Sequence, residues 1–441
     1  EKADAWLGAS RGLVDIIIGT RSSVFLPMKN LGIIVVDEEH DLSFKQMEKF
    51  RYSARDMALY RAKLEKIPVV LASATPSLET LKNVKEEKYK VLKLNKRATG
   101  ANLPTYHAVD LKGKELHEGL SKELLEATQT ELDKGNQVLI FLNRRGYAPS
   151  MICKACGWIS NCDRCDALMT VHKNPLKLHC HHCEAQKPYP SKCPSCGSDD
   201  FLTYGFGTER VEEFLRGHFP DTKTLRIDSD STRKKESLNQ YFDEIKKGEP
   251  IILLGTQLLA KGHHFPNVTL VGIIDADSGL FSADFRGSER VAQLMTQVAG
   301  RAGRDKKPGR VILQSYCLDH PQIEEIITGS YEKFAKKLLE ERKNYKIPPF
   351  SFQAKIFAES PKSLVSRDFI LKLLNQSKIE KQISSNVRIV GPLPSIMEKK
   401  SGVYRWELSI FSSNRTNLHK FLDIMQSRLY EPKLTRQVRW S

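Results

Sequence analysis

Short runs of aliphatic and β-branched residues that end in polar residues recur through much of the chain. They occur at 14–18, 32–37, 69–72, 137–142, 251–254 and 270–275. Such runs are typical of buried parallel strands whose carboxyl ends carry functional loops. Residues 53–64 have the pattern of a helix between two of these strands. Because strands and helices alternate on both sides of a cysteine-rich segment, the pattern predicts an α/β fold with two lobes.

From about Ile323 the pattern changes. A basic, helix-forming stretch at 331–346 is followed by period-two alternation at 352–357 and 404–411, and by helical periodicity at 361–377 and 416–429. The expected order, β-α-β-β-α, resembles a ferredoxin-like split unit. Gln437–Trp440 would begin a closing strand, at which the sequence stops. We therefore expect a truncated α+β domain at the C-terminal end.

The composition of the chain indicates the kind of partner that it binds and the cellular compartment in which it works. The 441 residues carry a formal net charge of +16, which favours a polyanionic partner such as nucleic acid over a merely soluble basic protein. No apolar run of about 18 residues occurs, so no transmembrane helix or membrane partner is expected. Nine cysteines, eight of them tightly paired, fit metal thiolates in a reducing cytosol.

Eight cysteines form four Cys-x-x-Cys pairs. The pairs are Cys153/Cys156, Cys162/Cys165, Cys180/Cys183 and Cys193/Cys196. Because each Zn²⁺ takes four thiolates and each pair supplies two, the chain predicts two Cys₄ zinc sites. The favoured pairing is nested, since 14 residues separate the inner pairs, close to the usual spacing of a zinc ribbon. Sequential pairing, with five residues between its first two pairs, and redox-active pairs are the alternatives.

Two segments in the first lobe carry residues suited to nucleotide chemistry. Asp37 and Glu38 follow a predicted strand, where one carboxylate can hold Mg²⁺ and the next can polarise a water that attacks a γ-phosphate. A charged surface loop is the alternative. The segment 73–76 (SATP) follows the next strand and offers small hydroxyl groups, and 19–22 (GTRS) presents Arg21 to phosphate oxygens.

Two further segments of this kind lie in the second lobe. Residues 297–304 read QVAGRAGR, and the spacing predicts that Arg301 and Arg304 share one helix face from which they reach a γ-phosphate. The alternative is a basic surface pair. Residues 255–262 (GTQLLAKG), including Gly262, follow another strand and suit phosphate contacts.

Together these motifs resemble superfamily 2 helicases, and their details resemble the primosomal protein N′ (PriA) family of replication-restart helicases. The segments that carry the resemblance are DEEHDLSFKQ, FRYSARDMALYRA, SATPS, FLNRRGYAP, the eight-cysteine insertion, KGHHFPNVTLVGIIDADSGLFSADFR and QVAGRAGR. The resemblance covers nearly the whole chain. It implies two RecA-like lobes, with the first incomplete, a zinc-binding insertion in the second, and nested zinc pairing. The implied domains are 1–95, 96–150, 151–203, 204–322 and 323–441.

The resemblance also implies roles for individual residues. Asp37 and Glu38 match the acids for Mg²⁺ and water, and Arg304 is the expected arginine finger beside Arg301. The stretch 44–52 matches an aromatic-rich loop that couples DNA contact to hydrolysis. Its aromatic rings can stack on bases beside basic side chains, although core packing is the alternative. The expected DNA contacts are Arg21, Phe44, Lys45, Arg51, Tyr52 and Arg145.

The implied activity is ATP-dependent 3′→5′ unwinding at stalled or branched replication forks, followed by primosome assembly. The implied partners are forked and single-stranded DNA, primosome proteins and single-stranded DNA-binding protein. A monomer in the bacterial cytoplasm, associated with the nucleoid, is expected.

One departure from the family pattern is clear. No GxxxxGK[ST] motif occurs in the sequence, so the loop that cradles the nucleotide phosphates is missing. We therefore expect a fragment that lacks the family's N-terminal region and does not hydrolyse ATP alone. The alternative function is a non-catalytic protein that binds fork DNA and serves as a primosome scaffold.

Overall fold

The computed structural model shows two compact units, Glu1–Lys93 and Leu94–Ser441. It describes residues 2–441 except 48–49, 95–99, 101–102, 143–149, 154, 157, 159, 165–168, 174–175, 181–184, 205–207, 229–234, 257–258, 260–264, 275, 278–283, 304–306, 328–329, 378–385 and 430–437. Within the described residues, every helix is too short or too polar to span a bilayer.

The first unit is built on a pair of parallel strands. Its helices are α1 (Lys2–Arg11), η1 (Arg21–Phe25), η2 (Leu42–Phe44), α2 (Ala54–Glu65) and α3 (Leu78–Lys85), and its strands are β1 (Ile34–Val36), β2 (Lys45–Gln46), β3 (Tyr52–Ser53) and β4 (Val69–Leu71). In the β1–β4 pair, Ile34 lies opposite Val69 and Val36 opposite Leu71. Helix α2 begins at the N-cap Ser53, whose hydroxyl accepts a hydrogen bond from the Asp56 backbone N–H.

One predicted strand is absent from this unit. Residues 14–18 form no strand in the described structure, and the Ile16 and Ile18 side chains are 81% and 96% exposed. The run of β-branched residues was a correct local signal, but a strand also needs a neighbour that accepts and donates its backbone hydrogen bonds. The described residues supply none at 14–18, so the prediction was wrong here.

A six-stranded parallel sheet forms the base of the second unit, in the order β14-β15-β8-β16-β17-β5. Its strands are β5 (Thr105–Asp110), β8 (Gln137–Leu142), β14 (Lys223–Ile227), β15 (Ile251–Gly255), β16 (Val268–Ile274) and β17 (Arg310–Ser315), with the hairpin β6 (Leu116–His117) and β7 (Leu120–Ser121) beside it in sequence. Every side chain of β8 is buried, as expected for a central parallel strand covered on both faces.

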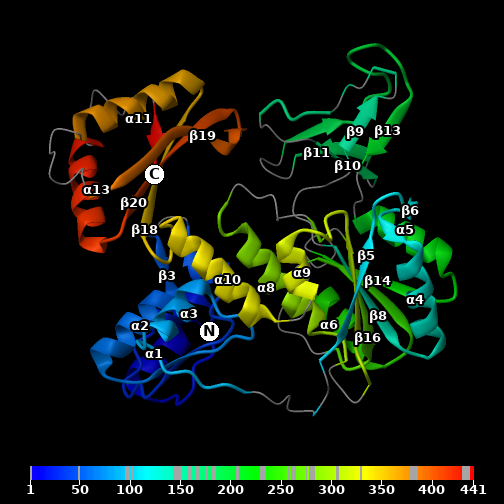
Figure 1. Cartoon of the computed structure of the whole chain (residues 1–441), viewed down its shortest axis with the longest axis horizontal. Helices are drawn as coiled ribbons and strands as arrows, with labels where there is room; N and C mark the ends of the chain where they lie inside the picture. Colours follow the sequence, from blue (N-terminus) through cyan, green and yellow to red (C-terminus); the bar gives the residue numbers. More distant parts are fainter. Residues whose placement is uncertain are drawn as a thin grey trace. The chain divides into compact units, whose positions relative to one another are not determined.

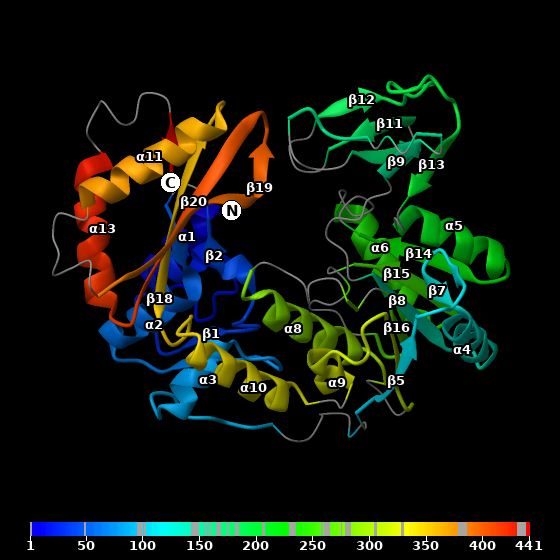
Figure 2. The ribbon, with the colours of Figure 1, turned by 45° about the horizontal axis from the view of Figure 1, so that its top comes forward.

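Helices α4 (Lys122–Asp133) and α5 (Thr208–His218) cover one face of this sheet (Figure 2). Leu124 and Leu215 pack there against the alternate β8 residues Val138 and Ile140. Helices α6 (Lys235–Lys246) and α8 (Gly287–Ala299) complete the α/β alternation. The predicted α/β class is confirmed.

A cysteine-rich module is inserted in the chain between β8 and α5. It is an antiparallel sheet in the order β12-β11-β10-β9-β13, formed by β9 (Ser150–Cys153), β10 (Thr170–Lys173), β11 (Leu176–His179), β12 (Gln186–Pro188) and β13 (Phe201–Tyr204). Its first and last strands pair, with Ser150 opposite Tyr204. The chain therefore leaves the module beside the point where it enters, which lets the insertion extend from the parallel sheet without breaking it.

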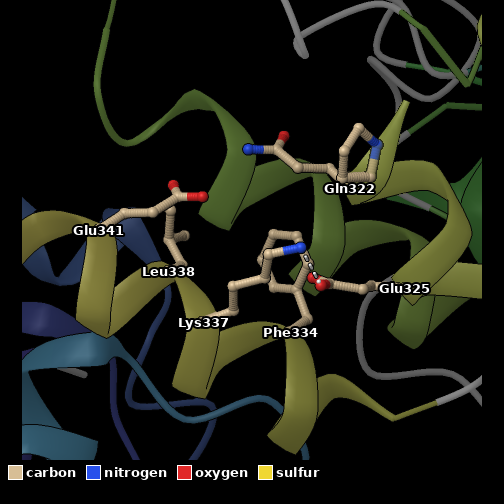
Figure 3. A pocket seen from close by; sticks show the side chains of 7 residues that line it. Gln322, Glu325, Phe334, Lys337, Leu338 and Glu341 are labelled. Atoms are coloured by element: carbon tan, nitrogen blue, oxygen red, sulfur yellow. Dashed lines mark ion pairs between the residues drawn. The ribbon is translucent and has the colours of Figure 1, made fainter. Parts of the chain in front are cut away.

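Two helices, α9 (Pro321–Ile327) and α10 (Tyr331–Asn344), follow the parallel sheet in sequence. A small pocket lies between them, and an ion pair of 2.7 Å joins Lys337 Nζ to Glu325 Oε1 across it (Figure 3). Helix α10 confirms the basic helix predicted at 331–346.

The C-terminal domain has strands β18 (Phe352–Ser360), β19 (Arg388–Lys400), β20 (Val403–Ser412) and β21 (Arg439–Trp440) and helices α11 (Ser363–Ser377) and α13 (Arg415–Leu429). Its antiparallel sheet runs β19-β20-β18-β21, the ferredoxin-like order. Helices α11 and α13 pack together on the sheet (Figure 1), and Phe369 and Phe421 meet Leu408 in its core. The strand expected at the end of the sequence is β21, which pairs with β18.

Candidate functional site

The two candidate catalytic acids lie in a turn at the carboxyl end of β1. Asp37 is exposed, and its Oδ1 accepts a hydrogen bond of 2.9 Å from the Glu38 backbone N–H. Glu38 is half-buried and has φ +48°, in the left-handed region. The turn is tied to the end of β4, because the Glu39 N–H donates to Ala72 O at 3.1 Å. The two carboxylates therefore sit at the edge of the sheet where parallel strands carry functional groups.

The predicted SATP segment contacts this turn directly. His40 Nδ1 and Ser73 Oγ are 2.8 Å apart, and Ser73 Oγ also accepts from the Thr75 N–H at 2.9 Å. His40 Nδ1 lies 3.7 Å from Glu38 Oε2. The two segments, separated by more than 30 residues in sequence, are thus hydrogen-bonded to each other through His40 and Ser73, beside Glu38.

Arg21 lies against the aromatic-rich loop. Its Nη1 donates to Ser43 O at 3.2 Å and to Lys45 O at 3.5 Å, so the guanidinium supports the loop backbone. This contact reaches the loop from the short helix η1, which sequence alone did not connect to residues 43–45.

The rings of the loop differ in exposure. Phe50 is 72% exposed, whereas Phe44 and Tyr52 are half-buried. The Tyr52 ring packs edge-on against Phe25, with centroids 4.9 Å apart, and lies 5.9 Å from the Phe50 ring. Lys45 and Arg51 are exposed beside them. Phe50 with its basic neighbours therefore offers an exposed stacking face, while Tyr52 anchors the loop.

In the second unit, helix α8 ends before Arg301, so Arg301 does not lie on the helix face predicted for it. Helix α8 ends at Ala299, and Gly300 caps it by donating to Thr296 O and Val298 O. Arg301 lies in the turn that follows and is 4% exposed. The helix pattern could not continue through Gly300 and Gly303, because glycine favours termination at such positions. Arg304, Gly262 and Arg145 lie outside the described residues.

Four cysteine sulfurs come together at one end of the cysteine-rich module. The Sγ atoms of Cys153, Cys156, Cys193 and Cys196 all lie within 4.8 Å of one another. Cys153 and Cys196 are 3.6 Å apart, and Cys156 and Cys193 are 3.7 Å apart. Tetrahedral Zn²⁺ with Zn–S bonds of about 2.3 Å needs sulfurs roughly 3.8 Å apart, so these residues fit zinc.

The thiols of this cluster perturb one another. Burial acts to raise the pKa of Cys153, but hydrogen bonds, first that of the Cys156 backbone N–H, outweigh it and lower the pKa to about 7. For Cys196, a hydrogen bond from the Ser198 backbone acts to lower the pKa, but hydrogen bonding with neighbouring thiols, first that of Cys156, raises it to about 12.

The inner pairs are described only in part. Cys162 and Cys180 are buried in one cluster with Met151 and Met169, and Cys162 Sγ accepts from the Arg164 N–H at 3.4 Å. Cys165 and Cys183 lie outside the described residues. The inner site therefore stays a prediction.

Comparisons with known proteins address the whole chain. Family models match at 1–84 (DEAD/DEAH box helicase), 162–188 (PriA DNA helicase Cys-rich region domain), 198–306 (Helicase conserved C-terminal domain) and 343–441 (Primosomal protein N C-terminal domain). "Replication restart protein PriA" of Haemophilus influenzae is 46% identical over 95% of this chain and 57% of its own length. The Bacillus subtilis protein of that name is 38% identical over 96% of this chain and 52% of its own length.

The chain belongs to the PriA family. It spans a little more than half of the length of these two PriA relatives. Among solved structures, S. cerevisiae Dbp5 bound to RNA and ADP BeF3 matches with 14% identity and a TM-score of 0.37, covering 70% of this chain and 63% of that chain. That score is too low to bear on the site.

Sequence reasoning missed one group in this PriA chain. Glu39, the third residue of the DEEH segment, is 2% exposed and accepts hydrogen bonds from Arg55 and Ser77. The only signal in the sequence was a third acid where the expected chemistry uses two. Its partners lie 16 and 38 residues away, so the local pattern could not reveal them.

Proposed function

We propose that the PriA family protein containing this chain is an ATP-dependent 3′→5′ DNA helicase that recognises stalled or branched forks and initiates primosome assembly. The observation that carries this proposal is the cluster in which Asp37, Glu38, His40 and Ser73 meet at the end of a parallel strand pair. A protein that only held DNA would not need such a cluster of acids. Primosome proteins and single-stranded DNA-binding protein are the partners we propose.

The residues present fit Mg²⁺ and a nucleotide. Asp37 offers an exposed carboxylate, a ligand type that Mg²⁺ prefers, and would hold the ion. Bound Mg²⁺ would neutralise charge on the β- and γ-phosphates. Glu38 would orient and deprotonate the attacking water, and His40 at 3.7 Å would hold the Glu38 carboxylate in place. Arg301 and Arg304 would supply positive charge to the γ-phosphate.

DNA would contact the aromatic-rich loop at 44–52. Phe50 would stack on a base, and Lys45 and Arg51 would meet the backbone phosphates. Arg21 would act at this surface through its two hydrogen bonds to the loop backbone. The zinc sites would be structural, since four thiolate ligands leave no open position on a tetrahedral ion.

We further propose that residues 1–441 alone do not hydrolyse ATP, because the sequence has no GxxxxGK[ST] segment to bind the phosphates. The test compares ATP turnover by purified 1–441 with that of the longer PriA family polypeptide, each with single-stranded DNA. We expect turnover only in the longer polypeptide, and its loss in E38Q. DNA-stimulated turnover by 1–441 would contradict the proposal.

A non-catalytic fork-binding scaffold is the second candidate. The exposed Phe50 and the zinc module favour it, because neither needs hydrolysis to bind a partner. In the longer polypeptide, E38Q separates the two functions. A scaffold keeps primosome assembly on a fork when hydrolysis is lost, whereas a motor loses unwinding.

A further inference from the structure

Glu39 is a buried carboxylate with an unusual number of partners. Its Oε1 accepts from the Ser77 backbone N–H at 2.6 Å. Its Oε2 accepts from Ser77 Oγ at 3.1 Å and from Arg55 Nη1 at 3.0 Å. Arg55 Nη1 also donates to Ser77 Oγ at 2.9 Å, so the three side chains form a closed triangle. A buried charge is stable only with this degree of pairing.

The triangle joins three segments. Glu39 directly follows Asp37 and Glu38. Ser77 is the N-cap of α3, where its hydroxyl accepts from the Thr80 N–H. Arg55 lies in the first turn of α2. The carboxylate also lies at the N-terminus of α3, where the helix dipole favours negative charge.

The ionic character of the triangle is strong. Burial acts to lower the pKa of Arg55, but the carboxylates of Asp56, Glu39 and Glu79 outweigh it and raise that pKa. Arg55 therefore stays a cation, and the contact to Glu39 is a charge-assisted hydrogen bond, which holds its geometry more firmly than a neutral one.

Glu38 needs such support, because its backbone is in the left-handed region at φ +48°. Non-glycine residues occupy that region at a cost and keep it only where their surroundings fix them. On the C-terminal side of Glu38, the next residue is anchored twice, by its backbone bond to Ala72 O and by its side chain to Ser77 and Arg55. The backbone of Glu38 is thereby held from its C-terminal side by a residue whose own side chain is buried.

We propose that Glu39 and Arg55 are positioning residues that fix the direction of the Glu38 carboxylate for water activation. This inference rests on the proposed function, in which Glu38 acts on water. It makes the third residue of the DEEH segment part of the hydrolytic machinery, although that residue is turned away from solvent.

The test is steady-state ATP hydrolysis with single-stranded DNA by the longer PriA family polypeptide, in E39Q, R55K, E65Q and E38Q. E39Q keeps the size of the side chain and an oxygen for the Ser77 N–H, but it places an amide toward Arg55. We expect kcat to fall by about tenfold or more while the KM for ATP changes by less than about twofold, because positioning acts on the transition state.

E65Q is the matched control, since Glu65 forms an exposed ion pair of 2.6 Å with Arg61 on the same helix as Arg55. It should leave kcat unchanged. R55K keeps the cation but loses the guanidinium whose Nη1 donates to both Glu39 and Ser77, so it should lower kcat as E39Q does. If E39Q does not fold, the kcat of R55K tests the proposal in its place.

Three outcomes separate the inference from the proposed function. If E38Q abolishes hydrolysis and E39Q and R55K keep wild-type kcat, the positioning role is wrong. If E39Q raises the KM for ATP and weakens DNA binding as much as it lowers kcat, the triangle only holds the fold, and the inference is again wrong. If E38Q retains hydrolysis, the proposed function itself fails.

Discussion

Cys153 Sγ and Cys196 Sγ lie 3.6 Å apart, although 43 residues separate them in sequence. The antiparallel β9–β13 pair brings Cys153 opposite Phe201, close to the turn that carries Cys193 and Cys196. This meeting favours a zinc site made of the first and last pairs and leaves the middle pairs to each other. The same strand pairing thus closes the module and assembles its outer sulfurs.

The nested arrangement predicts zinc content in the cysteine variants. We expect two zinc ions per wild-type chain and one in C162A/C180A, because both changes remove ligands from the same inner site. Sequential or crossed pairing predicts none in this double variant, since each change then damages a different site. Elemental analysis of the purified chains measures the difference, and C317A, which changes a cysteine outside the pairs, should keep both ions.

Most of the fold could be predicted from sequence because local pattern determines it. The strand β8 is apolar at five of six positions, and burial on both faces is what such a run indicates. The alternation in β18 and β20 likewise indicated a half-buried antiparallel sheet. Residues 14–18 have the same local pattern as the buried parallel strands, but strand formation there depends on a neighbour that the pattern does not contain.

The candidate site was predicted less completely than the fold, because several of its contacts join segments that are far apart in the sequence. Asp37 and Glu38 could be placed because they directly follow a strand. The contacts of Glu39 with Arg55 and Ser77, and of Arg21 with Ser43, join segments that no periodicity relates. Such side-chain contacts arise only once α2 and α3 are packed, so they needed the structure.

The exposed ring of Phe50 leads to a DNA-binding prediction. F50A should weaken binding of single-stranded DNA by about 1–3 kcal/mol, or roughly 5- to 150-fold, because a stacking face is lost. Fluorescence anisotropy with a labelled oligonucleotide measures the change at fixed salt. Y60A is the control, since Tyr60 is 59% exposed on α2 in the same unit but lies outside the loop. Equal losses in both variants would count against a specific role for the loop.

Arg342 and Glu289 lead to a stability prediction for the second unit. Arg342 Nη2 lies 2.8 Å from Glu289 Oε2 and also donates to Phe285 O at 3.2 Å, and the Arg342 side chain is 1% exposed. R342M leaves Glu289 as a buried charge without its cation, so we expect a loss of about 3–5 kcal/mol. The measurement is unfolding of the second unit in denaturant, which gives the free energy of unfolding of R342M and of the wild-type chain.

The matched control for R342M is K355M. Lys355 pairs with Glu407 at 2.9 Å, but its side chain is 37% exposed, so the loss should be at most about 1 kcal/mol. If R342M and K355M lost similar free energies of unfolding, burial of the Arg342–Glu289 ion pair would not make it more important for stability than the exposed pair.

Gly272 gives a last prediction, about the centre of the parallel sheet. A Cβ at this position of β16 would lie 2.7 Å from Leu124 Cδ1 and 3.1 Å from Ile140 Cδ1, so the ends of these two buried side chains must shift to admit even a methyl group. G272A should therefore destabilise the unit by about 1–3 kcal/mol through overpacking. In G217A, near the end of α5, a Cβ would meet no atom within 4 Å, and alanine should instead stabilise the helix by up to about 1 kcal/mol. The thermal unfolding temperatures of the two variants should therefore shift in opposite directions. If G272A unfolded at the wild-type temperature, α4 could move away from β16 without loss of stability, and the prediction would be wrong.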